Sequence, residues 1–408
     1  MTATTLSWLR ERTTLLAGLP AFRSHVLDSS SRRRSTKPLD AMFEDEILDR
    51  ESKPRSRPWR IALGTVQDGE SRVGWGILLS SFDSDTGAFG NVKLGAKYGN
   101  SATFFCLHPR LPLLYSVGRS GLFPHGSLAV FEIKGSSLRF LLEASSGGST
   151  PCHLAVDQAG TTLAVANYDD GVTSTFSLDE LGIPTSKFST RTVGEGPNKE
   201  RQDGSHPHGV YFREQILHVP DLGCDKIHCW EIAGPSAERE RATLASWRSL
   251  PGSGPRHMAF SPDGRHAYVV NELNSTVSAL AIDQGNKCFE TIHHISTIPE
   301  GETMRNTAAE IAIPPNGKFL YASNRGHDSI AIYARDSASG ALSRILIAPA
   351  GGENPRHFAI SPDGRWILCA HQDSDTVAAL PLDPESGMIG APVANISCPK
   401  PICVLFIA

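Results

Sequence analysis

The stretch that decides the fold runs Gly254-Pro-Arg-His-Met-Ala-Phe-Ser-Pro-Asp-Gly264 and returns, little changed, as Asn354-Pro-Arg-His-Phe-Ala-Ile-Ser-Pro-Asp-Gly364. Looser copies begin at Pro151, His206 and Ala308, which makes the period about 50 residues, a value in the range of known repeat architectures. In such architectures each repeat is one supersecondary unit that stacks against its neighbours. The repeat therefore predicts the fold before any single motif does.

Each repeat holds short runs of alternating apolar residues, rich in Val, Ile, Phe and Tyr, that are separated by turn residues. Pro262-Asp-Gly264 predicts a hairpin turn, because proline presets φ and glycine accepts a positive φ. The clearest copy predicts four strands, at residues 257–261, 265–271, 277–282 and near 289–295. Four antiparallel strands per period, repeated around a ring, indicate the blade of a β-propeller.

The two ends of the chain carry incomplete repeats. Residues 60–65 and 76–82 predict strands with no first strand before them, and residues 401–406 predict a first strand with no partner after it. Pairing the C-terminal strand with the N-terminal blade closes the ring and removes its exposed edges. We therefore predict an all-β, seven-bladed β-propeller over residues 59–408. The alternative is an open solenoid, which would need capping repeats rather than a split one. The predicted first strands begin near Thr103, His153, His208, His257, Glu310, His357 and Pro401.

The composition is that of a soluble globular protein, with 40% hydrophobic and 20% charged residues. The net charge is −4 and the repeats contain no basic block, which argues against a nucleic-acid surface. No apolar run approaches the roughly 18 residues of a membrane-spanning helix. The eight cysteines are scattered without a Cys-x-x-Cys motif, which predicts reduced thiols in a reducing compartment. We expect a monomer that binds neither nucleic acid nor a membrane.

The first 58 residues differ from the rest of the chain. Residues 1–38 carry seven basic and two acidic residues together with many Ser and Thr. This composition is typical of an organellar transit peptide and also of a disordered tail. We therefore expect residues 1–58 to form a disordered or targeting extension. The protein is then cytoplasmic or, if the extension is a targeting signal, mitochondrial or otherwise organellar.

Polar residues recur at two points of every repeat, the start of the first strand and the end of the second. Residues equally far from a hairpin turn face each other in an antiparallel pair, so Arg256 and His257 lie beside the end of the second strand. All these points fall on one rim of the ring, at one mouth of its channel. The residues delivered to this rim are His153, His208, Arg256, His257, Asn271, Glu272, Glu310, Asn324, Arg325, Arg356 and His357.

Some of these residues have an alternative role, because a His at the start of a first strand can tie neighbouring blades together by hydrogen bonds. Glu272, in contrast, is matched by Asp221, His371 and Tyr168 in sister repeats, so the blade does not require a glutamate there. We predict His208, Arg256, Glu272 and Arg325 as catalytic residues. The predicted substrate contacts are His153, His257, Asn271, Glu310, Asn324, Arg356 and His357.

Several arginines beside His and Glu predict an anion-binding pocket that also holds acid–base groups. A guanidinium pairs bidentately with a carboxylate or a phosphate. A neighbouring arginine keeps Glu272 ionised, while a histidine titrates near neutral pH. Such a set suits the attack of water on an activated carbonyl, or a proton transfer next to one. It does not suit a catalytic zinc, since no local ligand spacing is present, nor a serine nucleophile, because no Gly-x-Ser-x-Gly occurs. We expect no metal and no cofactor.

At these residues the sequence resembles the lactonase family of seven-bladed propellers, and the resemblance covers about residues 60 to 408. It implies one of two activities. The first is the hydrolysis of 6-phosphogluconolactone to 6-phosphogluconate in the pentose phosphate pathway. The second is the fungal cyclisation of 3-carboxy-cis,cis-muconate to its lactone. The segments that carry the resemblance are 206–208, 219–227, 254–264, 268–276, 320–330 and 400–406.

In the muconate enzymes the proposed site holds a His, two Arg and a Glu, which by motif resemble His208, Arg256, Arg325 and Glu272. The sequence departs from the family pattern at residues 64–66 and 116–119. We interpret the protein as a lactone hydrolase in which the two arginines hold the substrate's anionic group and polarise the lactone carbonyl. Glu272 or His208 then activates the water. The alternatives are the muconate cyclase and a non-catalytic propeller that binds a protein or a metabolite.

Overall fold

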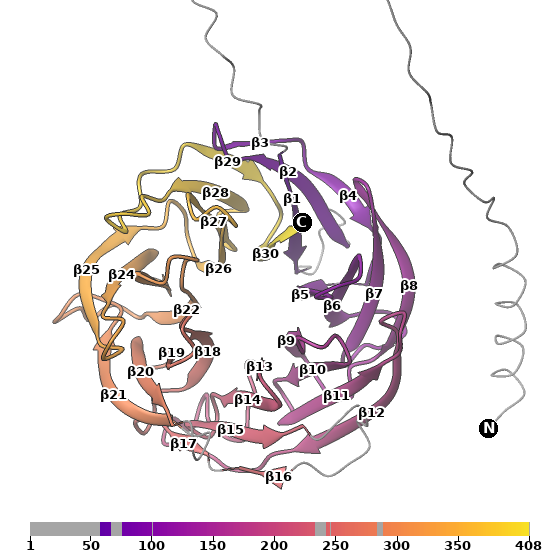
Figure 1. Ribbon diagram of the computed structural model, residues 1–408, viewed down its shortest axis with the longest axis horizontal. Helices are drawn as coiled ribbons and strands as arrows, with labels where there is room; N and C mark the ends of the chain where they lie inside the picture. Colours follow the sequence, from indigo (N-terminus) through magenta and orange to yellow (C-terminus); the bar gives the residue numbers. More distant parts are fainter. Residues whose placement is uncertain are drawn as a thin grey trace, which may run out of the picture. The chain divides into compact units, whose positions relative to one another are not determined.

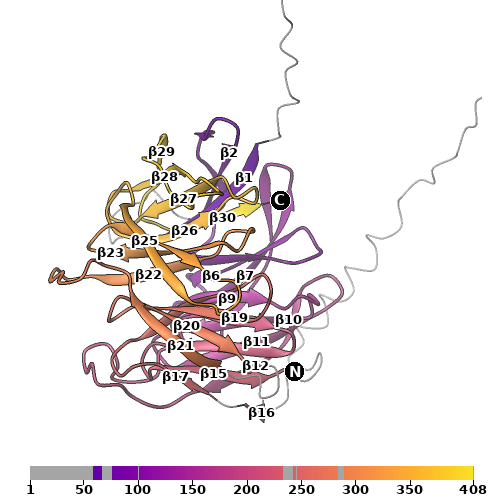
Figure 2. The ribbon, with the colours of Figure 1, turned by 60° about the vertical axis from the view of Figure 1, so that its left-hand side comes forward.

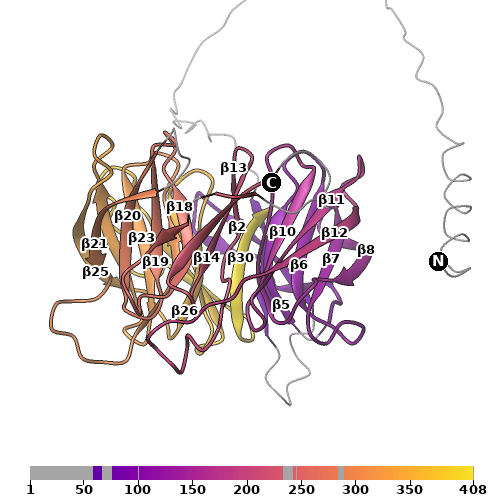
Figure 3. The same cartoon turned by 90° about the horizontal axis from the view of Figure 1, so that it is seen from below.

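The described residues form seven antiparallel sheets that stand around a central channel (Figure 1). The first strand of each sheet lies toward the channel and the last strand lies outside. Figures 2 and 3 show the same ring from two further directions, with the sheets side by side around it. The predicted seven-bladed β-propeller is confirmed. The structure is a computed structural model that describes residues 58–66, 76–99, 101–232, 242–244, 246–283 and 289–407.

Blades 1 to 4 account for the first half of the ring. Blade 1 contains β30 (Pro401–Ile407), β1 (Trp59–Thr65), β2 (Ile77–Asp83) and β3 (Ala88–Phe89), with β4 (Lys93–Ala96) also paired to β2. Blade 2 contains β5 (Ser101–Leu107), β6 (Leu113–Arg119), β7 (Ser127–Lys134) and β8 (Ser137–Ser145). Blade 3 contains β9 (Pro151–Val156), β10 (Thr162–Asn167), β11 (Val172–Leu178) and β12 (Pro184–Arg191). Blade 4 contains β13 (Tyr211–Arg213), β14 (Ile216–Asp221) and β15 (Lys226–Glu231), to which β16 (Ala242–Thr243) and β17 (Trp247–Arg248) both pair.

Blades 5 to 7 repeat the same order with regular four-stranded sheets. Blade 5 contains β18 (Pro255–Phe260), β19 (His266–Asn271), β20 (Thr276–Ile282) and β21 (Phe289–Ser296). Blade 6 contains β22 (Thr307–Ala312), β23 (Phe319–Arg325), β24 (Ser329–Arg335) and β25 (Leu342–Pro349). Blade 7 contains β26 (Pro355–Ile360), β27 (Trp366–His371), β28 (Thr376–Pro381) and β29 (Ala394–Ser397).

The ring closes through blade 1, where the last strand of the chain joins the first. β30 runs antiparallel to β1, with Arg60 opposite Ile407 and Gly64 opposite Cys403. Figure 1 shows this closure where the yellow C-terminal strand lies beside the indigo N-terminal one. Each end of the chain thus supplies the partner that the other lacks, as the incomplete terminal repeats predicted.

Buried tyrosines lock neighbouring blades together. Tyr115, Tyr268 and Tyr321 each lie in the second strand of a blade and are fully buried. Their hydroxyls donate to the backbone carbonyls of three glycines of the following blade at 2.7 to 2.9 Å, and these acceptors are Gly182, Gly340 and Gly387, respectively. The aromatic ring therefore fills the apolar space between two blades while its hydroxyl is satisfied across the seam.

The predictions for the two ends of the sequence have different outcomes. The first strand begins at Trp59, and all of the predicted extension except Pro58 lies outside the described residues, so its disordered or targeting role stays a prediction. The cysteines that the structure describes are free thiols, and Cys288 lies outside the described residues. Within those residues, no helix is long and apolar enough to cross a membrane.

Candidate active site

The first strand of a blade carries a β-bulge near its start. In blade 5, Pro255 lies opposite Asn271 and His257 opposite Val270, so Arg256 is one extra residue on its strand. A bulge turns the extra side chain away from the regular alternation, and bulges are common next to active sites. Equivalent register shifts occur in the first strands of blades 1, 2, 3 and 7. The extra residues there are Ile402, Thr103, Cys152 and Arg356.

His208 holds the same position in blade 4. Pro207 forms a bridge with Asp221 as Pro255 pairs with Asn271, so the residue that follows each proline is equivalent. The backbone N–H of His208 donates to the carbonyl of Pro220 at 2.9 Å. His208 therefore corresponds to Arg256 rather than to His257.

Two adjoining cavities of about 720 and 680 Å³ open where these bulges gather. The first, here called the Glu272 cavity, also holds Arg325; the second, here called the His257 cavity, also holds Arg256 and His357. The bulged residues supply part of the lining, and residues at the end of each second strand supply more. The residues that line both cavities are Thr150, Cys152, His208 and Arg356.

Pairing with these prolines shows which positions of the blades correspond. Asp221, Asn271 and His371 each pair with the proline that precedes a bulge. The match of Glu272 with Asp221 and His371 is therefore wrong by one residue, because Asn271 is the residue that corresponds to both of them. The residues equivalent to Glu272 are Tyr168, Arg325 and Gln372, which follow the same register.

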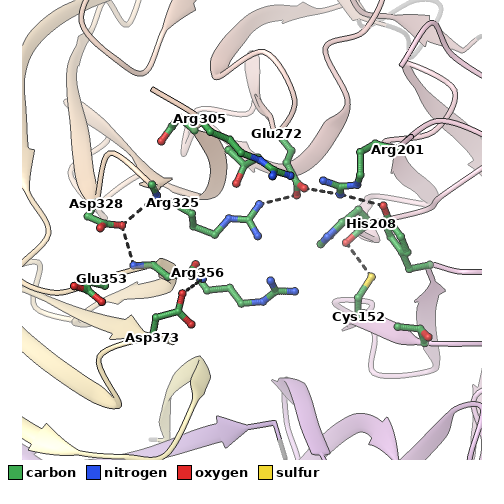
Figure 4. Close-up of a pocket in the computed structure, with 16 residues that line it drawn as sticks. Cys152, Arg201, His208, Glu272, Arg305, Arg325, Asp328, Glu353, Arg356 and Asp373 are labelled. Atoms are coloured by element: carbon green, nitrogen blue, oxygen red, sulfur yellow. Dashed lines mark hydrogen bonds and ion pairs between the residues drawn. The ribbon is translucent and has the colours of Figure 1, made fainter. Parts of the chain in front are cut away.

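Arginines from three places converge on the carboxylate of Glu272, and Figure 4 shows two of them, Arg201 and Arg325. Arg201 Nη2 lies 2.7 Å from Oε1, while Arg256 Nε and Arg325 Nη2 lie 3.0 and 2.9 Å from Oε2. Arg256 also donates from Nη1 to the backbone carbonyl of Ala309 at 2.6 Å. The carboxylate thus holds guanidinium groups from blade 5, blade 6 and the segment between blades 3 and 4 in one cluster.

The charges of the cluster decide the protonation state of Glu272. Burial alone would raise the pKa of this carboxyl, but Arg325, Arg256 and Arg201 outweigh burial and hold the pKa well below its ordinary value. Glu272 is therefore ionised at neutral pH and is a weak base. Because both of its oxygens are engaged, its role in this arrangement is to position the arginines.

His208 lines both cavities and has one unpaired ring nitrogen. Its side chain is buried, and Nδ1 has no hydrogen-bond partner among the described residues. Burial, followed by the charges of Arg256, His257 and Arg356, lowers the pKa of His208 well below 6.5. The imidazole is therefore uncharged at neutral pH, with a nitrogen free to accept a proton.

A second layer of predicted residues lies one position further along each first strand. His257 Nδ1 and His357 Nε2 lie 3.0 and 3.4 Å from Oε2 of Glu310. Burial raises the pKa of Glu310 and lowers that of His257. The backbone N–H groups of Val210 and Val404 donate to Nδ1 of His153 and His357, each at 3.3 Å. These contacts join neighbouring blades, which is the alternative role that the sequence left open for these histidines.

Asn271 and Asn324, two of the predicted substrate contacts, form hydrogen bonds to other residues of the fold. The amide of Asn324 donates to the carbonyl of Thr297 at 2.8 Å and accepts from its hydroxyl at 2.6 Å. The amide nitrogen of Asn271 donates to the hydroxyls of Thr276 and Ser278. Both asparagines are fully buried and neither lines the two cavities. The structure therefore assigns them to the scaffold.

Arg356 differs from the arginines that contact Glu272. Figure 4 shows its guanidinium pointing into the Glu272 cavity with no dashed line to a neighbour, and among the described residues no side chain forms an ion pair with it. Burial and the repulsion from Arg325 and Arg256 lower the pKa of Arg356 to about 9. It remains a cation at neutral pH, without an anionic partner.

Arg201 is the main residue that the sequence did not indicate. It lies in the connection between β12 and β13, bonds Glu272 and also donates to the hydroxyl of Tyr168 at 3.2 Å. Gln202, which is fully buried, anchors this connection by donating to the carbonyl of Leu222 and to Asp225. Aligned repeats cannot reveal Arg201, because the connection has no counterpart in the sister blades.

Among the described residues, no group of three His, Cys, Asp or Glu side chains is placed to hold a metal ion.

Comparison with known proteins agrees with this architecture. The model of the seven-bladed β-propeller lactonase family matches residues 60–406. A 6-phosphogluconolactonase of Bacillus subtilis is 31% identical over 351 residues, which span 85% of this chain and 97% of that protein. A 6-phosphogluconolactonase of Formosa agariphila is 36% identical over 301 residues, or 71% and 83% of the two chains.

A solved structure extends the likeness to three dimensions. The periplasmic gluconolactonase of Pseudomonas aeruginosa superposes with a TM-score of 0.80 at 28% identity, covering 86% of this chain and 99% of that one. The family match spans nearly the whole propeller, including every blade that contributes to the two cavities. The chain therefore belongs to the lactonase family of seven-bladed β-propellers.

Proposed function

We propose that the protein hydrolyses 6-phosphogluconolactone to 6-phosphogluconate. The observation that carries this proposal is a cluster of guanidinium groups around one carboxylate, next to an uncharged histidine with a free ring nitrogen. The names of the two curated relatives support this substrate. Hydrolysis of a lactone needs only an activated water and stabilisation of an oxyanion, and the cluster offers both.

The first step is the attack of water on the lactone carbonyl. His208 takes a proton from the water through a ring nitrogen, and the water oxygen forms a bond to the carbonyl carbon. The imidazolium that results lies among arginines, but the oxyanion formed in the same step offsets its charge. A general base in this role contributes about 10² to 10⁴ in rate.

The oxyanion needs hydrogen-bond donors that are already in place. Arg325 lines the Glu272 cavity, and 13% of its side chain is exposed. Glu272 holds this guanidinium and that of Arg256 in fixed positions. Preorganised donors cost little reorganisation when charge develops in the transition state. We therefore assign Arg325 and Arg256 to the carbonyl oxygen, and Glu272 to their positioning.

In the second step the tetrahedral intermediate collapses. The bond between the carbonyl carbon and the ring oxygen breaks, and His208 returns its proton to that oxygen. The product is an open chain with a carboxylic acid and a new hydroxyl. The acid then releases its proton to solvent and becomes the carboxylate, so atoms and charge balance without a cofactor.

The test is turnover by the purified full-length protein on two substrates, 6-phosphogluconolactone and 3-carboxy-cis,cis-muconate. The decay of the first is followed by phosphorus NMR with the spontaneous rate subtracted, and the loss of the second by its ultraviolet absorbance. We expect hydrolysis of the lactone well above the uncatalysed rate. Cyclisation of the muconate without lactone hydrolysis would replace this proposal with the cyclase, and turnover of neither substrate would favour a binding scaffold.

A further inference from the structure

The two most similar repeats of the chain place an arginine on the same bulge but differ in the residue beside it. Glu272 follows the second strand of blade 5, and its backbone N–H donates to the carbonyl of Gly254 at 2.8 Å. In blade 7 the same hydrogen bond joins the N–H of Gln372 to the carbonyl of Asn354 at 3.0 Å. Gln372 therefore occupies the position of Glu272. Blade 5 carries a carboxylate there and blade 7 carries an amide.

This difference leaves Arg356 without the counterion that Arg256 has. A partly buried guanidinium with no anion is unfavourable, and repulsion from Arg325 and Arg256 adds to the cost. Two acidic residues that line the Glu272 cavity, Asp328 and Asp373, have other partners, while Glu353, which also lines it, is exposed to solvent. Asp328 accepts from the backbone of Gly326 and Asn354, and Asp373 accepts from the side chain of Asn354. The site is therefore built to receive a negative charge from outside.

Arg356 lines the same cavities as the residues assigned to the lactone carbonyl. It lines both cavities, as does His208, while Arg325 lies with Glu272 in the first cavity. A substrate whose carbonyl lies at Arg325 and His208 then has its far end available to Arg356. The planar fork of a guanidinium suits a phosphate or a carboxylate, to which it donates two parallel hydrogen bonds.

We propose that Arg356 binds the anionic substituent of the substrate and sets the preference of the enzyme for phosphorylated over neutral sugar lactones. This inference rests on the proposed hydrolysis and deepens it. It also gives the arginines of the site two separate roles. Arg256 and Arg325, which are bonded to Glu272, serve the carbonyl, and Arg356, beside Gln372, serves the phosphate.

The experiment compares the kcat/KM of the full-length protein for 6-phosphogluconolactone and for glucono-δ-lactone, which lacks the phosphate. Loss of a charge-assisted hydrogen-bonding partner costs about 10 to 100-fold in binding, so Arg356→Gln is expected to lower the ratio of the two kcat/KM values by about that factor. The change falls mainly on KM for the phosphorylated lactone. Arg356→Lys keeps the positive charge but loses the planar guanidinium, so its ratio of kcat/KM values is expected between those of the wild type and of Arg356→Gln.

A second variant tests the same idea without removing the arginine. Gln372→Glu recreates in blade 7 the pairing that blade 5 has, so the new carboxylate competes with the phosphate for Arg356. We expect the ratio to fall here as well, by about tenfold or more. The matched control is Arg265→Gln, which removes one positive charge from the turn at the other end of the blade-5 strands. Thermal unfolding confirms that each variant is folded.

The outcomes separate this inference from the proposed function. Suppose that the wild-type protein hydrolyses 6-phosphogluconolactone. If Arg356→Gln and Gln372→Glu then lower kcat/KM equally for both lactones, or for neither, the role of Arg356 is wrong while the function stands. If the wild-type protein hydrolyses only glucono-δ-lactone, the proposed substrate and the role of Arg356 both fail. A selective loss for the phosphorylated lactone in both variants, absent in the control, supports the assignment.

Discussion

Blades 5 and 7 are nearly the same in sequence and fold, yet they supply the site with opposite kinds of arginine. Both begin with Pro-Arg-His, and both place the arginine on a bulge. Arg256 is bonded to Glu272 at 3.0 Å, whereas Arg356 has Gln372 at the corresponding position. The blade thus delivers a side chain to the cavity, and the residue 16 positions later decides whether that side chain is held or free. Substitutions that change the surroundings of one of these two arginines at a time test whether this difference matters.

The largest effect is expected from Glu272→Gln, which gives blade 5 the residue of blade 7. Removing one partner from a buried ion pair leaves uncompensated charge and costs about 3–5 kcal/mol. We therefore expect a loss of unfolding free energy of that size, measured by urea denaturation, and a fall in kcat because Arg256 and Arg325 lose their fixed positions. Glu385→Gln, which removes an exposed carboxylate, is the control. Stability and kcat close to wild type would show that Glu272 does not organise the arginines.

The next effect concerns the proposed base. His208→Asn removes the ring nitrogen that accepts the proton, and kcat/KM for 6-phosphogluconolactone is expected to fall about 10² to 10⁴-fold. The loss is measured after subtraction of spontaneous hydrolysis. His294→Asn, on the outer strand β21, is the matched control. A rate within a factor of a few of wild type would remove His208 from the mechanism.

A smaller effect, on stability alone, is expected from Asn324→Ala. The side chain is fully buried and satisfies both polar groups of Thr297. Leaving such groups unpaired costs about 1–3 kcal/mol, while kcat/KM stays close to wild type because Asn324 lines neither cavity. Denaturation and steady-state kinetics on the same preparation measure both quantities. A selective loss of activity in a stable Asn324→Ala protein would restore its predicted role as a substrate contact.

The smallest effect is a shift in pH dependence. His208 accepts a proton only when it is uncharged, and its pKa lies well below 6.5 because of burial and the charges of Arg256, His257 and Arg356. The acid limb of kcat/KM for glucono-δ-lactone is therefore expected below pH 6.5. Removing the charge in Arg356→Gln raises the pKa of His208 and moves this limb to higher pH. A limb at or above pH 6.5 in the wild-type protein, or no movement in the variant, would contradict the assignment of the base.

The fold could be predicted because the signals that determine it are local and repeated. The Pro-Asp-Gly turn recurs in blades 5 and 7, and the unpaired strands at the two ends leave closure of the ring as the consistent solution. The four residues predicted as catalytic do gather around the two cavities, since repeat position alone carries them to one rim. Hairpin spacing finds this rim without any knowledge of side-chain contacts.

Three features of the site could not be predicted, each for a physical reason. Hairpin pairing places residues on the rim but does not show which side chains bond within a blade, as that of Asn271 does with Thr276 and Ser278. Arg201 comes from a connection that has no equivalent in the other repeats. The uncompensated charge of Arg356 depends on which side chains surround it in space, and the order of residues along the chain does not show those surroundings.

In the proposed orientation of the substrate, the lactone carbonyl lies at Arg325 and His208 and the phosphate lies at Arg356. The most direct test is a crystal structure of the full-length protein with the product, 6-phosphogluconate. We predict the phosphate within hydrogen-bonding distance of the Arg356 guanidinium, and the carboxylate beside Arg325 and His208. A phosphate bound by Arg325, with Arg356 contacting no part of the product, would contradict the account.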